Sequence, residues 1–458
     1  MFKFLQALEG YKDTTAIKSL NKEASFTVTY SQYSKAIKRC AFNIYSSIGD
    51  VNGRHIGILC DSNYDYTIIL FALIFSRAVV VPINNYDNKE NIEYIIKNAN
   101  LDWLILDEEY RDKVSCDIAC ISKEACFISS TDERMLLDFN EDEDDSPVLI
   151  VYTSGTTGFP KGVVISAGNL FGHKKELLGG FTKVYLGFPF HHIGGIHSLI
   201  ARLENGCMVY LSNNIRNALF DLEGEQIDMG AVPPIILKMW IKAIKRGKLG
   251  RIGNAKMIGS GGAKIDSETI RTISNSGIVF GQCYGMTETS GNITSIANDL
   301  QHLDSVGKPI QGMEILIIDG EVCVKGERVM TGYYNNEEET DNCLKYGVLH
   351  TGDLGYLDDD GYLYITGRKK NLIILSSGEN VSPEELEDKL YACSLIRECK
   401  VYEESDKIVA AVYAAEKDYD AIREFVHELN KQQPIFKRIH SVTFQGEFEK
   451  TSSGKIKR

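Results

Sequence analysis

Apolar runs of strand length alternate with longer stretches of helical pattern along most of this chain. The segments "HIGILC" (55–60), "YDYTIILFALIFS" (64–76) and "AVVVPI" (78–83) have the patterns of a strand, a helix and a strand. Such alternation is typical of parallel sheets covered by helices, because a parallel pair needs a crossover connection. After residue 147, strands are expected at 148–152, 183–188, 206–211, 256–260 and 277–284, and helices at 233–246 and 266–276.

Composition and charge limit the functions that this chain can have. It has 458 residues, 43% of them hydrophobic and 25% charged, which is typical of a globular protein of two or three folding units. The formal net charge of −13 disfavours nucleic-acid binding and adhesion to anionic membranes. The most apolar stretch, 67–83, contains Arg77 and Pro82 and is too short for membrane insertion. With no visible targeting segment and 11 scattered cysteines, we expect reduced thiols and a cytoplasmic location.

The sequence changes character from about residue 314. "MEILIIDGEVCVKG" (313–326) has two strand-like runs joined by Asp-Gly, which predicts a hairpin, and a second hairpin is expected within 355–371. Farther on, "SPEELEDKLYAC" predicts a helix with Ser382 as N-cap, Pro383 at its first position and Glu385 completing a capping box. These signals predict a small α+β unit at the end of the chain.

The segment "YTSGTTGFPK" (152–161) follows an apolar strand and combines glycines, hydroxyls and a lysine. Glycines let backbone N–H groups turn toward a ligand, and hydroxyls and an ammonium group donate hydrogen bonds to anions. The Walker pattern GxxxxGK[ST] is not met, because Gly162 follows Lys161. The segment is therefore expected to bind phosphate in another way, through Thr153, Ser154, Gly155, Thr156, Thr157, Gly158 and Lys161.

In its longer form "YTSGTTGFPKGV", this segment resembles the nucleotide-phosphate loop of the adenylate-forming superfamily, which includes acyl-CoA synthetases, peptide-synthetase adenylation domains and beetle luciferases. The motifs "YGMTET" (284–289), "TGD" (351–353), "GRKKN" (367–371) and "TSSGKIKR" (451–458) follow in the order of that family. The resemblance extends from near residue 20 to the last residue. Acyl- and aryl-CoA ligases are the most similar branch.

The resemblance implies an α/β fold of the acyl-CoA synthetase type. A large N-terminal AMP-binding domain, residues 1–366, would contain helix-covered β-sheets and a distorted barrel, in sub-parts of about 1–140 and 147–366. Residues 367–370 would form a hinge. Residues 371–458 would form a small mobile α+β domain that carries the catalytic lysine. Whether the protein is a monomer or a homodimer is left open.

The resemblance also implies the activity. A small-molecule carboxylic acid would attack ATP in the presence of Mg²⁺ to form an acyl-adenylate and pyrophosphate, and a thiol, coenzyme A, would then take the acyl group. An acyl carrier protein is the alternative acceptor. The alternative functions are an o-succinylbenzoate–CoA ligase-like enzyme and a non-catalytic nucleotide-binding protein. A P-loop ATPase or kinase, which would release ADP, is disfavoured by the unmatched Walker pattern.

Residue roles follow from the same resemblance. Tyr284 would stack on adenine, Thr287 would donate to the α-phosphate, and Glu288 would hold Mg²⁺. Asp353 would accept hydrogen bonds from the ribose hydroxyls, and Arg368 would reinforce the contact with the ribose or a phosphate. Lys455 would bridge the reacting groups and His192 would close on the acyl group, so that the expected catalytic residues are Lys455, Thr287, Glu288 and His192. The remaining expected nucleotide-binding residues are Gly261, Gly262, Ala263, Gly285 and Lys370, the last also at the hinge.

The acyl pocket should be lined by 188–195, 231–235, 259–263 and the residues after Tyr284. "FPFHHIGG" (188–195) lacks the aspartate with which amino-acid-activating relatives pair the substrate ammonium group, and His191 stands where an aromatic residue is more usual. A plain carboxylic acid is therefore expected. Two alternatives stay open: an aromatic or dicarboxylic acid, with Lys264 or Arg202 facing a second carboxylate, and a fatty acid.

Overall fold

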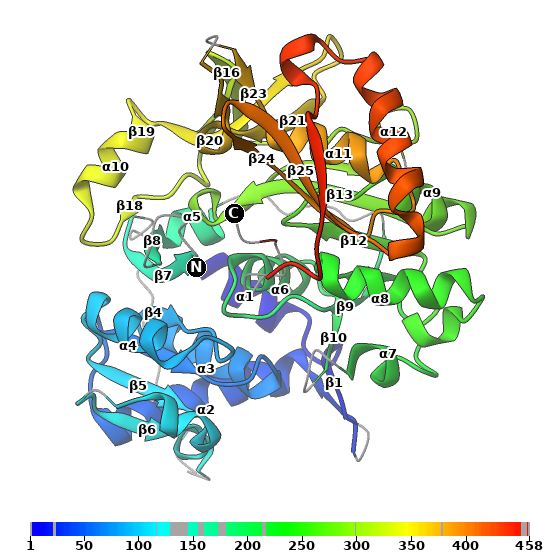
Figure 1. Cartoon of the computed structure of the whole chain (residues 1–458). Coiled ribbons are helices and arrows are strands. Elements are labelled where there is room, and N and C mark those ends of the chain that lie inside the picture. The colour runs from blue at the N-terminus through cyan, green and yellow to red at the C-terminus, as the bar shows by residue number, and fades with distance from the viewer. Residues whose placement is uncertain are drawn as a thin grey trace. The chain divides into compact units, whose positions relative to one another are not determined.

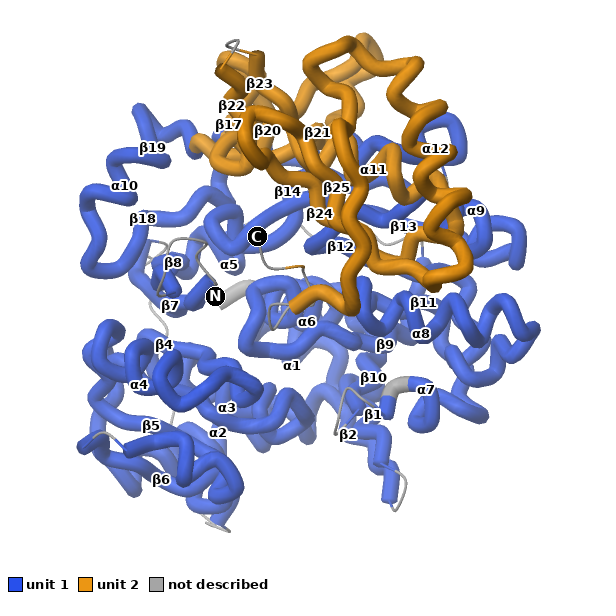
Figure 2. Tube along the Cα trace, viewed as in Figure 1, with its two compact units in different colours: residues 1–314, 325–349 blue, residues 315–324, 350–458 orange. Residues whose placement is uncertain are grey.

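The computed structural model of this chain describes residues 2–21, 24–115, 117–128, 145–153, 160–172, 180–212, 217–297, 299–376, 379–449 and 456 (Figure 1). The chain divides into two compact units, one of residues 1–314 and 325–349 and the other of residues 315–324 and 350–458 (Figure 2). The second unit thus begins where the sequence changes character. The expected boundary at 367–370 lies inside it, and the hinge role of those residues stays a prediction.

One seven-stranded sheet of the first unit contains the first predicted strand–helix–strand segment. Its strand order is β18 (Gly332–Tyr333), β8 (Lys161–Ser166), β7 (Pro147–Thr153), β4 (Val79–Pro82), β3 (His55–Leu59), β5 (Trp103–Leu106) and β6 (Cys120–Ser122). The strands from β7 to β6 run parallel, whereas β8 and β18 are antiparallel additions. Helices α2 (Tyr30–Ile48), α3 (Tyr64–Phe75) and α4 (Lys89–Asn98) belong to this layer.

Helix α3 explains the most apolar stretch of the sequence. Its residues from Tyr66 to Phe75 are all buried, and α2 packs against it, with the rings of Tyr33 and Phe71 6.4 Å apart. Helix α4 packs against the sheet. Its residues Ile92 and Ile95 belong to another apolar cluster, together with residues of strands β3, β4 and β5. A helix covered on all sides reads as continuously hydrophobic. Among the helices in the described ranges, none is both long and apolar enough to cross a membrane.

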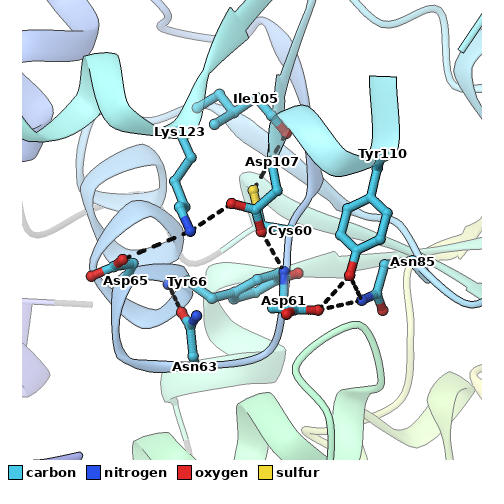
Figure 3. A network of polar contacts seen from close by, with 10 residues as sticks. All are labelled: Cys60, Asp61, Asn63, Asp65, Tyr66, Asn85, Ile105, Asp107, Tyr110 and Lys123. Carbon is cyan, nitrogen blue, oxygen red and sulfur yellow. Dashed lines mark hydrogen bonds and ion pairs between the residues drawn. The ribbon is translucent and has the colours of Figure 1, made fainter. Parts of the chain in front are cut away.

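Polar side chains connect the loops at the carboxyl ends of β3 and β5 (Figure 3). The backbone N–H of Asp61 donates to Asp107 Oδ2 at 2.9 Å, and Asp107 Oδ1 lies 2.5 Å from the Lys123 ammonium nitrogen. Asp61 Oδ1 accepts hydrogen bonds from the Tyr110 hydroxyl at 2.6 Å and from Asn85 at 2.7 Å. Ser62, the next residue after Asp61, accepts the backbone N–H of Phe190 at 3.0 Å. The loop after β3 therefore also holds the segment 188–195 in place, through Phe190.

The second sheet of the first unit has nine strands. Their order is β15 (Lys308–Pro309), β14 (Gly291–Ala297), β13 (Val279–Met286), β12 (Met257–Gly261), β11 (Met229–Ala231), β9 (Lys183–Leu186), β10 (Met208–Ser212), β1 (Thr15–Leu20) and β2 (Phe26–Thr29). The other helices of the unit are α1 (Phe2–Gly10), α5 (Ala167–Phe171), α6 (Ile193–Glu204), α7 (Ala218–Asp221), α8 (Pro234–Lys245), α9 (Ser267–Asn275) and α10 (Glu337–Cys343). The strands and helices expected after residue 147 are confirmed to within two residues.

Trp240 of α8 lies at the centre of the core under this sheet. Its side chain is fully buried and its ring centroid lies 5.9 Å from that of Tyr185 on β9. A Cβ on Gly230 of β11 would lie 2.2 Å from the Trp240 ring. The glycine in the strand therefore makes the space that the indole fills.

Both predicted hairpins lie in the second unit, although strands β16 (Met313–Ile318), β17 (Glu321–Gly326) and β20 (Val348–Leu357) each extend about two residues beyond its boundaries. A five-stranded sheet has the order β16, β17, β20 and β19 (Leu344–Lys345), and β21 (Leu363–Arg368) also pairs with β20. Asp319 and Gly320 both have positive φ, 51° and 76°, as a two-residue type I′ turn requires.

The rest of the second unit is an α+β layer with its own apolar core. It contains β22 (Ile373–Ile374), β23 (Asn380–Val381), β24 (Glu398–Glu404), β25 (Lys407–Tyr413), β26 (Ser441–Phe444), α11 (Pro383–Tyr391) and α12 (Tyr419–Lys431). Ser382 is the N-cap of α11, as predicted, and accepts the Glu385 N–H at 3.4 Å. The Glu385 carboxylate, expected to complete a capping box, pairs with Lys389 and Lys437 instead, because both ammonium groups lie 2.7 Å away.

Candidate active site

Four neighbouring parallel strands of the nine-stranded sheet end beside the segments that were expected to line the acyl pocket. These strands are β9, β11, β12 and β13, in that order. The segment 188–195 follows β9, 231–235 begins at the end of β11, and 259–263 closes β12. Open α/β sheets bind ligands outside the carboxyl ends of their strands. The fold therefore gathers these segments at one edge of the sheet.

The segment expected to bind phosphate connects β7 to its antiparallel partner β8. Thr153 ends β7 and is paired in register with Lys161, which begins β8, and the Thr153 hydroxyl donates to the Lys161 carbonyl at 3.5 Å. Ser154, Gly155, Thr156, Thr157 and Gly158 lie outside the described residues. The Lys161 ammonium forms an ion pair with Glu339 on α10. A phosphate group at Lys161 would compete with that carboxylate.

Glu288 lies on a short 3₁₀ helix, η5 (Thr287–Thr289), directly after β13. Its carbonyl accepts the Met330 N–H at 2.8 Å, and its Oε1 accepts the Tyr333 hydroxyl at 2.7 Å. The Lys161 ammonium lies 5.4 Å from the centroid of the Tyr333 ring. Burial, together with the Glu288 charge, raises the pKa of Tyr333, so that the phenol stays protonated and donates to the carboxylate. One tyrosine thus contacts both the loop lysine and the expected Mg²⁺ ligand.

The neighbours of Glu288 occupy a tight connection between β13 and β14. A Cβ on Gly285 would lie 2.1 Å from the Gly291 carbonyl oxygen, so this position must be glycine. The Tyr284 N–H donates to Thr294 Oγ1 at 3.2 Å, and the Tyr284 side chain is half-buried. Thr287, also half-buried, begins η5, beside the expected site of the α-phosphate.

Gly261, Gly262 and Ala263 come at the end of β12. A Cβ on Gly261 would lie 2.6 Å from the Cys283 sulfur on the adjoining strand, so packing between strands requires this glycine. Gly262 has a φ of 84° and open space where a Cβ would stand. Gly262 and Ala263 are exposed, as a ligand-facing loop would be.

Two adjacent histidines occupy the N-terminus of α6. His192 is the N-cap residue and half-buried, and its ring centroid is 4.4 Å from that of His191. His191 is buried, and its Nδ1 has no hydrogen-bond partner among the described residues. Burial, and then the neighbouring His192, lower the pKa of His191 well below its usual value. His191 is therefore a neutral side chain at physiological pH.

The lowered pKa of His191 predicts acid sensitivity. The unfolded chain binds a proton at His191 near pH 6.5 and the folded chain does not, so stability falls below about pH 6.5 by up to about 1.4 kcal/mol per pH unit. His191→Phe is expected to flatten this decline, measured as urea unfolding midpoints between pH 7 and pH 5. His427→Phe, an exposed change on α12, is the control. Equal declines in the wild type and His191→Phe would contradict the expectation.

Of the two cations considered for a second substrate carboxylate, Arg202 lies ten residues beyond His192 on α6. This separation is about 15 Å along the helix axis, and the Arg202 side chain is buried. Lys264 follows the carboxyl end of β12 and is exposed. Of the two side chains, Lys264 is therefore better placed to face a second carboxylate of a substrate in the expected acyl pocket.

In the second unit, "TGD" and "GRKKN" meet across adjoining strands. Asp353 on β20 is paired in register with Arg368 on β21, and the Arg368 Nε lies 2.7 Å from the buried Asp353 carboxylate. A Cβ on Gly367 would lie 2.2 Å from Ser382 Oγ, so this glycine lets the strand pass the N-cap of α11. Lys370 is exposed on the 3₁₀ helix η6 (Lys369–Asn371). Lys455 lies outside the described residues.

A model of the AMP-binding enzyme family matches residues 4–334. The chain belongs to the AMP-binding enzyme family. The match includes Thr153, Lys161, Glu288 and Tyr333 and ends before Asp353, so the motifs of the second unit lie outside it.

Curated relatives and solved structures are similar to this family member over nearly its whole length. The 2-succinylbenzoate–CoA ligase of Bacillus cereus strain AH820 is 27% identical over 470 aligned residues, covering 97% of this chain and 94% of that protein. The o-succinylbenzoate CoA synthetase of Bacillus subtilis with the acyl-adenylate OSB-AMP superposes with a TM-score of 0.86 at 23% identity, covering 100% of this chain and 96% of that one. The Bacillus subtilis enzyme with ATP and a magnesium ion gives 0.83 at 23% identity, covering 100% and 98%. These structures confirm the acyl-CoA synthetase-like fold.

Two features beside the family motifs were not predicted from the sequence. Tyr333 follows a glycine in "TGYY", and nothing in that pattern indicates its contact with Glu288, 45 residues earlier. Arg328 is 2% exposed, and its Nη1 donates to His197 Nε2 at 3.2 Å and to the Asn292 carbonyl at 2.9 Å. Because a guanidinium has no acceptor, His197 is held as the neutral tautomer with its proton on Nδ1.

Proposed function

We propose that this AMP-binding enzyme is an AMP-forming acid–thiol ligase of the acyl-CoA synthetase type. In the first step a carboxylate oxygen attacks the α-phosphorus of ATP, pyrophosphate leaves, and an acyl-adenylate remains. In the second step the thiol of coenzyme A loses its proton, its sulfur attacks the acyl carbon, and AMP leaves. The observation that carries the proposal is the contact of Tyr333 with both Glu288 and Lys161, which groups an anion and a cation beside the phosphate loop.

Glu288 fits the expected Mg²⁺ ligand. Its carboxylate is buried, and the Tyr333 hydroxyl fixes Oε1 from one side. A hard cation prefers such oxygen ligands together with phosphate oxygens. When bound, Mg²⁺ supplies positive charge that offsets the repulsion between two anionic reactants. Glu288 holds the ion, Tyr333 orients the carboxylate, and Lys161 and the loop hydroxyls donate to the phosphates.

The remaining roles follow the family motifs. Tyr284 stacks on adenine and Thr287 donates to the α-phosphate, while Asp353, held by Arg368, accepts hydrogen bonds from the ribose hydroxyls. Lys455 bridges the reacting carboxylate and α-phosphate during adenylation. Residues 367–370, with Lys370, act as the hinge that removes Lys455 before the thiol step.

The proposed acid is an aromatic dicarboxylic acid of the 2-succinylbenzoate class. Relatives that align with 97% of this chain are 2-succinylbenzoate–CoA ligases. Exposed Lys264 at the carboxyl end of β12 supplies a cation for the second carboxylate. His192 and the neutral His191 border the same edge of the sheet. Coenzyme A is the proposed acceptor, and the ten cysteines in the described ranges, all free thiols, suit a reducing cytoplasm.

A panel of acids with ATP, Mg²⁺ and coenzyme A tests this assignment. We expect 2-succinylbenzoate to give the highest rate of thioester formation, measured by mass spectrometry. 4-Oxo-4-phenylbutyrate and 2-propionylbenzoate, each of which lacks one of the two carboxylates and keeps the ketone, serve as matched controls. Equal rates with the monocarboxylic acids would contradict the dicarboxylic class. A thioester formed only when a phosphopantetheinylated carrier protein replaces coenzyme A would overturn the proposed acceptor.

The ion pair between Lys161 and Glu339 predicts an effect on ATP binding. Glu339→Gln removes the carboxylate that competes with phosphate for the Lys161 ammonium group. Because exposed or half-buried pairs contribute about 0.2–1 kcal/mol, we expect the KM for ATP to fall by up to about fivefold. Glu338→Gln, an exposed neighbour on α10, should leave it unchanged. A higher KM for Glu339→Gln would mean that Glu339 is needed to hold Lys161 in place.

A further inference from the structure

Three side chains with metal-binding atoms meet in the second unit, and none of them is among the residues proposed to bind nucleotide or substrate. Glu321 and Cys323 lie two residues apart on β17, so they point to the same face of the sheet, toward His350 on the neighbouring strand β20. Cys323 Sγ lies 3.4 Å from His350 Nδ1, and this nitrogen lies 3.2 Å from Glu321 Oε2. All three ligand atoms lie within 4.8 Å of one another.

The spacing of the sulfur and the nitrogen matches that expected in the ligand shell of a tetrahedral zinc ion. Zn–S and Zn–N bonds of about 2.3 and 2.05 Å at a tetrahedral angle place sulfur and nitrogen about 3.5 Å apart. The observed sulfur–nitrogen distance is 3.4 Å. A thiolate, an imidazole and a carboxylate suit this borderline-soft cation, whereas Mg²⁺ and Ca²⁺ prefer oxygen ligands alone.

We propose that Glu321, Cys323 and His350 bind a Zn²⁺ ion, in competition with Lys369. The Lys369 ammonium lies 2.9 Å from Glu321 Oε2, the same oxygen that faces His350. A zinc ion on this oxygen displaces the ammonium group by charge repulsion. The Lys369 side chain is 61% exposed, so it can move into solvent. Zinc binding therefore frees the side chain of Lys369, which lies between Arg368 and Lys370 in the sequence, from its ion pair with Glu321 on β17.

The surroundings orient the Glu321 carboxylate and keep the Cys323 thiol protonated until a metal ion binds. Cys323 is fully buried and Glu321 nearly so, and the Gly352 N–H donates to Glu321 Oε1 at 2.9 Å, which orients the carboxylate. Burial, and then the Glu321 charge, raise the pKa of Cys323 to about 11. Near neutral pH the thiol is therefore protonated. The S–H proton passes to solvent as the Zn–S bond forms.

Cobalt(II) titration of the full chain, with Co²⁺ as the probe for zinc, tests the site. A thiolate bound to Co²⁺ gives a charge-transfer band in the near ultraviolet. We expect this band in the wild type and in Cys120→Ser, its loss in Cys323→Ser, and its disappearance when Zn²⁺ is added. No band in the wild type, or an equal band in Cys323→Ser, would overturn the proposal.

Lys369→Ala tests the competition in a variant that keeps all three ligands. Without the ammonium group, the affinity for Zn²⁺, measured by displacement of Co²⁺, is expected to rise by up to about fivefold. Lys407→Ala, an exposed lysine on β25, is the control and should not change it. Unchanged or weaker zinc binding by Lys369→Ala would refute the competition with Lys369.

Discussion

Replacing Glu288 by glutamine is expected to slow acyl-adenylate formation by about 10²–10³-fold. The change removes one negative charge from the proposed Mg²⁺ ligand and alters almost nothing else. The glutamine Oε1 can still accept the Tyr333 hydroxyl, and the backbone carbonyl still accepts the Met330 N–H. Single-turnover pyrophosphate release, measured at saturating ATP and acid, reports the step directly.

Tyr333→Phe separates orientation of the carboxylate from its charge. This variant keeps the Glu288 carboxylate and loses the hydroxyl that holds it, so a smaller loss of about 10-fold is expected. Raising the Mg²⁺ concentration should restore more activity to Tyr333→Phe than to Glu288→Gln. If Glu288→Gln retains the wild-type rate at low Mg²⁺ concentration, Glu288 does not hold the ion.

Trp240→Ala is expected to lower the free energy of unfolding by about 3–5 kcal/mol. The indole is fully buried, and Gly230 has no side chain that could fill the space it leaves. Native proteins are stable by only about 5–15 kcal/mol, so this loss takes a large share of the total. Urea unfolding followed by far-UV circular dichroism gives the midpoint. We expect a large decrease for Trp240→Ala and a smaller one for Trp240→Phe.

Tyr346→Ala is the matched control for that experiment. Tyr346 is fully exposed, so truncation there should change the free energy of unfolding by less than about 0.5 kcal/mol. Equal midpoints for Trp240→Ala and Tyr346→Ala would mean that the core under the nine-stranded sheet relaxes to close the cavity.

The elements that could be predicted from the sequence are those whose signals are local. The apolar helix 64–76, the Asp319-Gly320 turn and the Ser382 cap each depend on residues a few positions apart, and each was found within two residues of its expected place. Glu385 shows the limit of such signals. Its spacing from Ser382 predicts a capping box, but Lys437, 52 residues away, attracts its carboxylate.

The candidate site shows the same division. The motifs indicate Glu288, Lys161 and Asp353 because each of these residues lies in a short, characteristic stretch of sequence. The roles of these residues stay proposals. The ion pair of Lys161 with Glu339 joins residues 178 positions apart, and Tyr333 reaches Glu288 across 45. Such partners depend on strand pairing between β8 and β18, which no local pattern encodes. The split of the second unit into 315–324 and 350–458 has the same origin.

The most direct test of acyl-adenylate formation is the identity of the nucleotide product. Wild-type protein incubated with ATP, Mg²⁺, coenzyme A and the acid selected by the panel should release AMP and pyrophosphate in equal amounts, resolved by ³¹P NMR. Omitting the acid should abolish both products. Formation of ADP and inorganic phosphate, or AMP release that does not depend on the acid, would contradict the proposed function.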